Sequence, residues 1–412
     1  MRIAVIGSGI SGLSAAHYLS KKYKVDLFEK EDRFGGHSYT IDVCDNDKKI
    51  PIDIGFIVFN SQTYPNFINF LNSNDIEFEK SNMSFSVSVK GTNIEYSGNG
   101  LLGIFSNRKN LFNYNFFKMF LEIIRFYKKC NQLKDMDENL TLNNFLKDQK
   151  MSNYFINYHI IPMVSAIWSM PPYESKQMPL KFFLKFFQNH GLFNLTNRPQ
   201  WYTIKNRSRT YVNKILKTVS GEYYKNYNIK KVSRHSNGVK VFYGESDEFF
   251  NYDKVVIATH ADQSLSLIDD PTSEERDILK NFKYKTNLAL IHTDESVMPN
   301  NKKVWSSWNS SVSKDNSSET SITYWLNMLQ NLTTNKNIFL TLNSFQNIEK
   351  EKIIKKVNFT HPYYDKQALD NQNKLIGIQN KKNILFCGSY FGYGFHEDGI
   401  KSSLEMMKNI DD

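Results

Sequence analysis

The sequence has few cysteines and no long apolar run. Its three cysteines, Cys44, Cys130 and Cys387, lie far apart in 412 residues and form no CxxC pair. This spacing argues against a disulfide framework or a zinc site and suits a reducing compartment. No uninterrupted apolar run reaches the roughly 18 residues that a membrane-spanning helix needs. Because the first residues, MRIAVIG, read as a strand, we also expect no signal peptide. We therefore expect a cytoplasmic protein, either soluble or peripheral at the inner membrane surface.

Glycine and proline are also sparse, with 19 and 10 residues, while hydrophobic residues make up 40% of the chain and aromatic residues 14%. This composition is typical of a globular protein with a large core and not of a disordered chain. The length predicts two domains. The net charge is +10, but the lysines occur as scattered pairs. We therefore expect no nucleic-acid partner and a weak attraction to anionic membrane surfaces.

The N-terminal segment has the pattern of a dinucleotide site. An apolar strand, a glycine turn, a helix of small residues and a second strand follow one another, and the second strand ends in Glu29. In such a β-α-β unit Gly7 permits the tight turn, Gly9 lets the backbone approach a pyrophosphate, and Gly12 allows the helix to pack closely on the strand. The helix N-terminus attracts the phosphates, and Glu29 can accept hydrogen bonds from the adenosine ribose.

The residues after the second strand favour FAD over NAD(P). Arg33 and the pair Gly35 and Gly36 stand where a nicotinamide domain would continue into its next crossover helix, and a short strand then ends with Asp53 and Gly55. Paired glycines indicate another close approach of the backbone to a ligand. In these features the sequence resembles the FAD-dependent amine oxidase superfamily, whose members have an R-x-G-G stretch and a D-x-G turn near the flavin. The resemblance implies FAD as the cofactor and a Rossmann-like, glutathione-reductase-like FAD-binding domain.

Further motifs extend the resemblance over nearly the whole chain. They include NRPQWYTI (197–204), SRTYV (208–212), HPYYD (361–365) and the terminal GYGFHEDG (392–399). The sequence looks like a bacterial branch of the superfamily, described as predicted NAD/FAD-binding, amine-oxidase-like oxidoreductases. Members are commonly associated with cyclopropane-fatty-acid-synthase-like lipid methyltransferases, and relatives have been linked to the desaturation of modified acyl chains. The resemblance therefore implies an apolar or lipid substrate and a lipid methyltransferase as a partner.

The resemblance also implies an α/β fold with two domains. We expect a discontinuous FAD-binding domain formed by residues 1–80, 200–265 and 375–412, and an α+β substrate domain formed by residues 81–199 and 266–374. One departure is that Asn206 and Arg207 replace the usual Gly-Gly pair of the family. Arginine adopts the left-handed conformation less readily than glycine, so we expect the local approach to flavin or substrate to differ there.

Near the C-terminus, the segment GSYFGYGFHEDG reads as the end of a buried strand, a glycine turn and the start of a helix. Adjacent side chains diverge in a turn and the sequence supplies no partner cluster, so a metal site at His396, Glu397 and Asp398 is disfavoured. We expect Asp398 to cap the helix. His396 and Glu397 are the candidate catalytic residues, as a proton acceptor or as groups that orient the substrate.

The resemblance assigns the rest of this segment to the flavin ring. In the superfamily the matching strand and helix bracket the isoalloxazine, and the helix N-terminus faces N1 and C2=O, where negative charge develops. The resemblance thus implies that Gly394 and Gly399 keep side chains away from the ring, within one cofactor-binding segment that also contains Gly388 and Asp398. Ser389 replaces an acidic residue that often holds the ribityl chain.

Two predicted helices in the middle of the chain are rich in phenylalanine. Their apolar faces consist of Phe117, Phe120, Leu121 and Ile124 in the first, and of Leu180, Phe183, Leu184 and Phe187 in the second. This spacing predicts that each face packs in the core of the substrate domain. The alternatives are an apolar substrate channel or a face that touches a membrane.

His292, Asp294 and His361 are further candidate reactive groups, although lone polar residues at strand ends or in loops are more often structural. An amine oxidase commonly uses a lysine near flavin N5, and the sequence offers only Lys285 as a candidate, which disfavours amine oxidation. We interpret Cys387 as strand packing and not as a covalent flavin link.

These features predict an FAD-dependent oxidoreductase that passes a substrate hydride to flavin N5 and desaturates an apolar lipid or fatty-acyl substrate. Three alternatives stay open. They are a flavin-dependent amine oxidase, a flavin-dependent isomerase without net redox turnover, and a flavoprotein that serves only as a binding partner in a lipid-modifying assembly.

Overall fold

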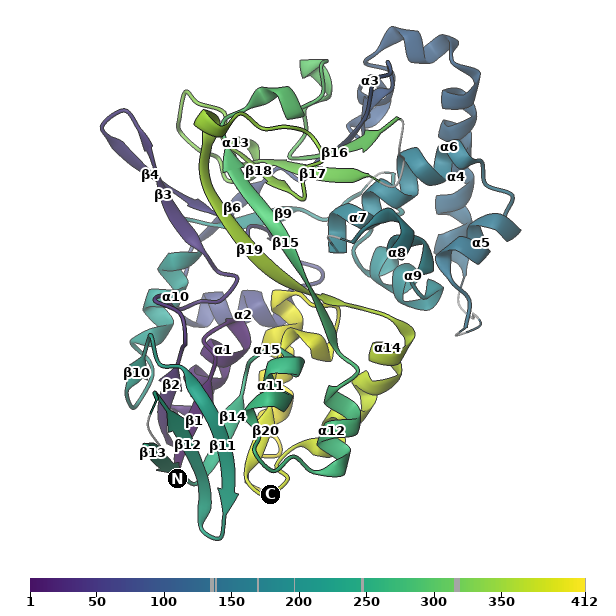
Figure 1. Ribbon diagram of the computed structural model, residues 1–412. Helices are drawn as coiled ribbons and strands as arrows, with labels where there is room; N and C mark the ends of the chain where they lie inside the picture. The colour runs from purple at the N-terminus through teal and green to yellow at the C-terminus, as the bar shows by residue number, and fades with distance from the viewer. Residues whose placement is uncertain are drawn as a thin grey trace.

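Figure 1 shows the computed structural model of the chain, which describes residues 1–133, 137, 139–168, 170–195, 197–245, 248–314 and 319–411. A parallel sheet lies in the lower part of this view, with both chain termini nearby, and a larger sheet lies above it. Two long strands, β15 (Lys283–His292) and β19 (Ile353–Tyr363), run between the two parts. A block of helices stands at the right.

The described strands of the parallel sheet stand in the order β10 (Tyr223–Tyr224), β2 (Lys24–Phe28), β1 (Arg2–Ile6), β14 (Lys254–Ile257) and β20 (Ile384–Phe386). Helix α1 (Ile10–Leu19) connects β1 with β2, which confirms the predicted β-α-β unit. The strands come from three separate parts of the sequence, so the sheet is discontinuous along the chain. The predicted domain boundaries themselves stay a prediction.

Strand β1 supplies two hydrophobic cores because successive side chains point to opposite faces of a sheet. Ile3 and Val5 pack with helices on one face, whereas Ala4 and Ile6 pack with an antiparallel sheet on the other. The helices on the first face are α1, α2 (Pro65–Ser73), α10 (Ser208–Leu216) and α15 (His396–Met407). The second face carries β11 (Ile229–His235), β12 (Gly238–Tyr243) and β13 (Phe249–Tyr252), with α11 (Ala261–Leu267) and α12 (Ser273–Leu279).

The larger sheet is mixed. Its described strands stand in the order β19, β15, β18 (Phe339–Leu342), β17 (Thr320–Trp325), β16 (Trp308–Ser313), β7 (Phe85–Lys90) and β8 (Glu95–Ser97). The pair β16 and β7 is parallel and the other pairs are antiparallel. Smaller pairings join β5 (Phe59–Asn60), β9 (Trp201–Ile204) and β6 (Phe78–Ser81), and β3 (Thr40–Asp45) with β4 (Lys48–Asp53). Helices α13 (Leu326–Leu329) and α14 (Lys366–Gln372) follow β17 and β19 along the chain.

The block of helices comprises α3 (Gly100–Ile104), α4 (Tyr114–Gln132), α5 (Leu142–Asp148), α6 (Asn153–Phe155), α7 (Ile161–Trp168), α8 (Pro172–Gln177) and α9 (Leu180–Asn189). In α9 the predicted apolar face is buried, which confirms its packing role. In α4 the predicted core face is wrong, because Phe117, Leu121 and Ile124 are exposed. The helix instead buries the face that includes Phe116 and Phe126.

The departure at Asn206 and Arg207 leaves the local backbone in the conformation that glycine favours. Their φ angles are 59° and 76°, and the expected difference in the approach to flavin or substrate stays a prediction. Arginine is strained at such angles, and the contacts of its buried side chain offset the cost. Arg207 Nε donates to the carbonyl of Pro51 (3.0 Å) and Nη2 to that of Gln330 (2.7 Å).

Burial lowers the pKa of most histidines in this fold. The affected residues are His17, His37, His159, His190, His260, His292, His361 and His396, which is eight of the nine in the chain. The unfolded chain, with ordinary pKa values of about 6.5, therefore binds more protons below that pH than the folded protein does. Burial raises the pKa values of the Asp53 and Asp398 carboxyl groups to about 6 and about 7. Below these values the two groups bind more protons in the folded protein than in the unfolded chain.

We predict that the free energy of unfolding rises with pH between about 4 and 6.5, because the eight histidines outweigh the two carboxyl groups. The Tm at about pH 5 should be lower than that at about pH 7 by at least about 5 °C. Differential scanning calorimetry at constant ionic strength and constant ligand content measures this difference. An equal or higher Tm at the lower pH would contradict it.

Candidate functional site

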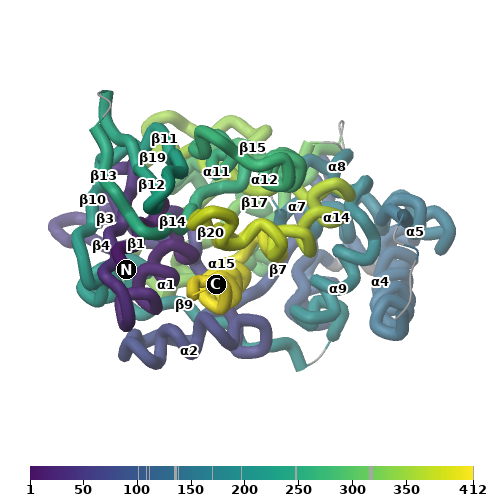
Figure 2. The backbone as a smooth tube through the Cα atoms, turned by 90° about the horizontal axis from the view of Figure 1, so that it is seen from below, coloured from purple at the N-terminus to yellow at the C-terminus, as the bar shows by residue number. Residues whose placement is uncertain are grey.

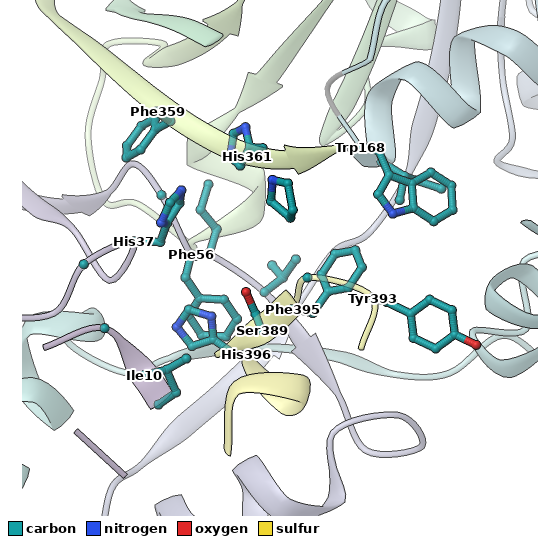
Figure 3. A pocket seen from close by; sticks show the side chains of 18 of the residues that line it. Ile10, His37, Phe56, Trp168, Phe359, His361, Ser389, Tyr393, Phe395 and His396 are labelled. Atoms are coloured by element: carbon teal, nitrogen blue, oxygen red, sulfur yellow. The ribbon is translucent and has the colours of Figure 1, made fainter. Parts of the chain in front are cut away.

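A cavity of about 1150 Å³ opens where the strands of the parallel sheet end. Segments that follow β1, β14 and β20 line one end, and residues of the larger sheet and of helices α7 and α9 line the other. Figure 3 shows its centre, with His37 and His361 on one side, Ser389 and His396 below them, and Trp168 and Tyr393 at the far end. The carboxyl ends of parallel strands are the usual ligand site of open α/β sheets.

The glycine turn after β1 forms the first wall. Gly7 and Gly9 line the cavity, and a Cβ added at Gly9 would meet no protein atom within 4 Å, so its backbone faces open space. Glu29 lies beside the turn, where its carboxylate accepts hydrogen bonds from the Ser8 amide (3.0 Å) and the Glu31 amide (3.0 Å). This places a carboxylate at the position expected for ribose recognition.

The second glycine turn packs directly on the first. A Cβ at Gly36, where φ is +56°, would stand 2.9 Å from the Cα of Gly9, so only glycine lets the two turns meet. Arg33 does not line the cavity. Its Nη1 donates to the Gly36 carbonyl (2.7 Å) and its guanidinium lies over the Tyr39 ring, so it holds the turn in place.

The structure divides the predicted site residues into two groups. Those that line the cavity are Gly7, Gly9, Glu29, Gly36, Gly55, Gly388, Ser389, Gly394 and His396. Those that lie outside the lining and pack against the segments that form it are Gly12, Arg33, Gly35, Asp53, Glu397, Asp398 and Gly399. Gly12 packs against the Gly7 carbonyl and Gly399 against Ile10 and Ser11, which brings α15 close to the start of α1, as Figure 2 also shows.

His396 begins helix α15 at the cavity wall. Its ring stacks on Phe56, with centroids 3.5 Å apart, and its Nε2 lies 3.0 Å from Ser38 Oγ and 3.2 Å from Tyr211 OH. Burial lowers the pKa of His396 well below its usual range, so the imidazole is neutral. One ring face of His396 thus contacts Phe56, and its Nε2 already has hydrogen-bonding neighbours. The catalytic role of His396 stays a prediction.

The place of Glu397 does not fit the predicted catalytic role. Its Oε1 accepts from the Asn66 amide (3.1 Å) and its Oε2 from the Phe67 amide (2.9 Å). These amides belong to the first turn of α2, whose positive end a carboxylate stabilises. The carboxylate of Glu397 therefore serves α2 and lies outside the cavity lining.

Two further carboxylates predicted at the cofactor also cap helices. Asp398 Oδ2 accepts from the Phe395 amide (2.9 Å) at the start of α15, which agrees with the expected capping. Asp53 accepts from the Ser208 amide (2.8 Å) and hydroxyl (2.6 Å) at the start of α10. Neither side chain lines the cavity, so direct cofactor contact is corrected to support of the neighbouring helices.

Three histidines meet at the centre of the cavity, and sequence reasoning singled out only His361 as reactive. The ring centroid of His37 lies 5.2 Å from that of His361 and 6.5 Å from that of His260. His37 Nε2 and His260 Nδ1 are buried without a hydrogen-bond partner. Burial lowers the pKa of His37 to about 4, of His260 to about 4 and of His361 to about 3. All three are therefore neutral at physiological pH.

His37 directly follows the glycine pair that ends at Gly36, and His260 comes shortly after β14, within the predicted FAD-binding domain. That position, at a glycine turn or at the carboxyl end of a parallel strand, is the signal that could have identified them. His361 differs from the other two, because the Asn287 amide nitrogen lies 2.9 Å from its Nδ1. In the neutral ring this leaves the hydrogen on Nε2.

The far end of the cavity is an apolar arm. Its apolar lining residues are Met163, Ala166, Ile167, Trp168, Phe186, Leu192, Leu195, Leu329, Leu340 and Leu342, and the ring of His190, which stacks on Phe186, lines the cavity beside them. Among the described lining residues Glu29, at the opposite end, is the only carboxylate, and Arg198 lines the cavity three residues after Leu195. Arg198 is exposed, and its Nε donates to the carbonyl of Asn194 (3.0 Å), so it stands at the rim of the arm.

The remaining candidates lie outside the cavity lining. His292 pairs with Thr341 (2.8 Å) inside the larger sheet, and Asp294 accepts from the Ser296 amide (3.0 Å). Lys285 pairs with Glu174 on α8. Cys387 is fully buried in the core beside α1, where burial raises the pKa of its thiol, as expected for strand packing. Among the described residues, no group of His, Cys, Asp and Glu could hold a metal ion.

The residues of the cavity fit FAD. Two helices, α1 and α15, begin at its wall, and their positive ends favour anionic groups. Glu29 supplies an acceptor beside them, and the open space at Gly9 leaves room for a pyrophosphate. The volume exceeds the roughly 300–1,000 Å³ of an ordinary ligand pocket, as expected for a site that holds a dinucleotide together with a substrate.

We predict that Gly9→Val abolishes flavin binding without unfolding the protein. The φ of Gly9 is −62°, which valine tolerates, and its Cβ would project into the open space of the cavity. Bound flavin, measured by visible absorbance after purification, should fall at least about tenfold. Gly377→Val is the matched control, since its Cβ also meets no atom within 4 Å but lies outside the cavity. A Gly9→Val protein with full flavin content would remove the site assignment.

We also predict that Glu397→Gln lowers stability and leaves turnover intact. The variant removes the charge and one acceptor from the N-terminus of α2, which should cost about 1 kcal/mol and lower the Tm by about 2 °C. Glu405→Gln on the same helix, which breaks only the ion pair with Lys408, is the control. Loss of turnover at unchanged Tm would instead restore the catalytic role of Glu397.

Comparisons with known proteins agree with this geometry. The sequence matches the model of the NAD(P)-binding Rossmann-like domain over residues 5–73. No curated protein matches it. A CLA-producing fatty acid isomerase from P. acnes has 14% identity and a TM-score of 0.68, over 99% of this chain and 98% of that chain.

Two oxidases are similar to the same extent. A putative protoporphyrinogen oxidase from an Exiguobacterium species has 13% identity and a TM-score of 0.69, over 100% of this chain and 99% of that one. Cyclohexylamine oxidase from Brevibacterium oxydans has 13% identity and a TM-score of 0.68, with the same coverage. Identities of this size show the fold, and they confirm the predicted α/β, two-domain class. The chain has the fold of the amine-oxidase-like oxidoreductases, with a Rossmann-like domain in its N-terminal part.

Proposed function

We propose that the protein is an FAD-dependent oxidoreductase that introduces a double bond into a long acyl chain of a lipid. The observation that carries this proposal is the charge distribution of the cavity. Its arm is lined largely by apolar side chains, its rim bears the cation Arg198, and the single carboxylate among its described lining residues, Glu29, lies at the far, dinucleotide end. Such an arm suits an amphiphile with an apolar chain and an anionic head.

The cofactor would be held at the end of the cavity opposite the arm. The turns at Gly7, Gly9 and Gly36 would receive the pyrophosphate, Glu29 the adenosine ribose, and the segment from Gly388 to His396 the flavin. FAD supplies the hydride acceptor when it is bound. The apolar arm would orient the acyl chain and exclude water from it, because the contacting rings of Trp168 and Phe186 are part of its lining.

Desaturation removes two hydrogens from adjacent carbons of the chain, one as a hydride and the other as a proton. The proton needs an acceptor in the cavity. His37 is neutral, and its Nε2 is buried without a partner, so we assign it this role. His361, which carries its hydrogen on Nε2, can donate a hydrogen bond to a polar group of the substrate or cofactor.

Amine oxidation is the less suitable alternative for this cavity. An ammonium substrate would need a carboxylate or another acceptor in the arm, and the cation Arg198 stands at its rim instead. The lysine that the family would use is also misplaced, because Lys285 pairs with Glu174 outside the cavity lining. The cavity lysines, Lys30 and Lys230, flank the dinucleotide end.

Isomerisation of a double bond is the alternative that a specific observation favours. The isomerase from P. acnes shares the fold over nearly the whole chain, and its description names a fatty acid. The same apolar arm would hold such a substrate. Isomerisation moves a double bond without net oxidation, so it requires no external electron acceptor.

The test is the visible spectrum of the purified, flavin-loaded protein under anaerobic conditions. We expect phospholipids with unsaturated or methyl-branched acyl chains, dispersed in detergent, to bleach the oxidised flavin band, and cyclohexylamine to leave it unchanged. Mass spectrometry of the lipid should show the loss of two hydrogens. Bleaching by the amine alone would overturn the proposal, and a shifted double bond without bleaching would favour the isomerase.

Arg198→Gln sharpens this experiment. It should raise the lipid concentration for half-maximal bleaching by about threefold to tenfold, because it removes one exposed ion pair with the lipid head. Arg276→Gln, an exposed arginine on α12, is the control. His37→Gln should slow bleaching while flavin content and lipid affinity stay the same, which separates proton transfer from binding.

A further inference from the structure

Helix α4 exposes an apolar stripe to solvent. Tyr114, Phe117, Leu121 and Ile124 follow one another at helical spacing, and they are 78%, 47%, 52% and 39% exposed. The segment before the helix adds Phe112, which is 92% exposed. Single exposed apolar residues are ordinary, but a contiguous group of large ones marks an interaction site. We call these five residues the α4 stripe.

The α4 stripe is separate from the face by which α4 packs in the core. The opposite face of α4 is already packed, with Phe116, Met119, Ile123 and Phe126 buried in the largest core of the helical block. The helix is therefore apolar on two faces, one of which the fold does not use. Figures 1 and 2 both place α4 at the outer edge of the molecule.

The described exposed charges on α4 and on the segment before it have one sign. Between Tyr96 and Gln132 the sequence has a single acidic residue, Glu122. This residue is buried and accepts a hydrogen bond from the Ser152 amide (3.0 Å), so it adds no exposed negative charge. The exposed cations of the segment are Lys109, Lys118, Arg125, Lys128 and Lys129. An apolar helix face flanked by cations is typical of a helix that lies in the interface of an anionic membrane.

The stripe continues toward the cavity. A surface depression of about 390 Å³ is lined by Ile124 and Lys128 of α4, and it shares Tyr127 and Leu195 with the large cavity. Arg198 lines the cavity near the same place. The end of the stripe thus lies beside the rim of the apolar arm.

We propose that the α4 stripe and its flanking cations dock the protein on an anionic phospholipid bilayer, and that acyl chains pass beside Leu195 and Tyr127 into the arm. The docking is independent of the chemistry, whereas the passage of acyl chains rests on the proposed function. No helix among the described residues is long and apolar enough to cross a membrane, so the contact is with the membrane interface.

The charges favour a bilayer over a second copy of the chain. If two copies were joined through the stripe, Lys118, Arg125 and Lys128 of one would face the same cations of the other. Like charges opposed in this way repel. Anionic lipids would instead neutralise all of them.

The test is cosedimentation with vesicles at low and high salt. The intact protein should bind vesicles that contain phosphatidylcholine and phosphatidylglycerol mixed in equal amounts. It should bind only weakly to vesicles of phosphatidylcholine alone. High salt should weaken the binding, because it screens the cations. The double variant Phe117→Ser/Leu121→Ser should bind the anionic vesicles at least about tenfold more weakly. Its Tm should be unchanged, because both side chains are exposed.

Ile376→Ser is the control, since Ile376 is also a large exposed apolar residue (65%) but lies outside the helical block. Lys118→Glu/Lys128→Glu should weaken binding to anionic vesicles and remove most of its salt dependence. Equal binding by the serine double variant and the intact protein, or no binding by either, would overturn the proposal. So would a dimer in analytical ultracentrifugation that the serine variant abolishes, because the stripe would then join two copies.

The outcome separates docking from chemistry. Bleaching by detergent-dispersed lipid without vesicle binding would overturn the membrane proposal and leave the proposed function intact. Vesicle binding without bleaching by any lipid would overturn the lipid substrate and leave the docking surface intact.

Discussion

The close packing of β1, α1 and α15 is the constraint on which the rest of the site depends. A Cβ at Gly12 would stand 1.8 Å from the Gly7 carbonyl oxygen, and one at Gly399 would stand 2.7 Å from Ile10 Cγ2. The hydroxyls of Ser14 and Ser403 lie 2.8 Å apart across the same contact. Because α1 and α15 meet near their N-terminal ends, both N-termini face the same cavity. The positive ends of the two helix dipoles together suit the phosphates of a dinucleotide.

Three carboxylates near the cavity stabilise this frame and do not line the cavity themselves. Glu397 caps α2, Asp53 caps α10 and Asp398 caps α15. Each satisfies backbone amides that would otherwise lack partners at a helix start. The groups that face the centre of the cavity are instead neutral imidazoles such as those of His37 and His361. A site of this kind presents hydrogen-bonding groups to an apolar substrate without the desolvation cost of a charge.

Local sequence signals predicted the parts of the fold and site that local interactions determine. The β-α-β unit followed from Gly7, Gly9 and Gly12, because strand, turn and helix are adjacent in sequence. The burial of the apolar face of α9 followed from the helical spacing of its apolar residues. The same reasoning failed for α4, since a helix that is apolar on two faces gives no signal of which face is buried. Long-range pairs were also out of reach, because Asp53 and Ser208, 155 residues apart, meet only in the folded chain.

The electrostatic gradient along the cavity links the two ends of the proposed reaction. At one end helix N-termini and Glu29 suit a charged, hydrogen-bonding cofactor, and in the middle the histidines are polar but uncharged. The arm beyond is apolar, and outside its rim the charges of Arg198 and α4 are positive. An amphiphile that enters from an anionic surface would therefore keep its head at the basic rim while its chain crosses the apolar arm toward the imidazoles. The reactive carbons would then lie along the chain and away from the head. On the proposed function, the chemistry would therefore take place on C–C bonds and not at a charged nitrogen.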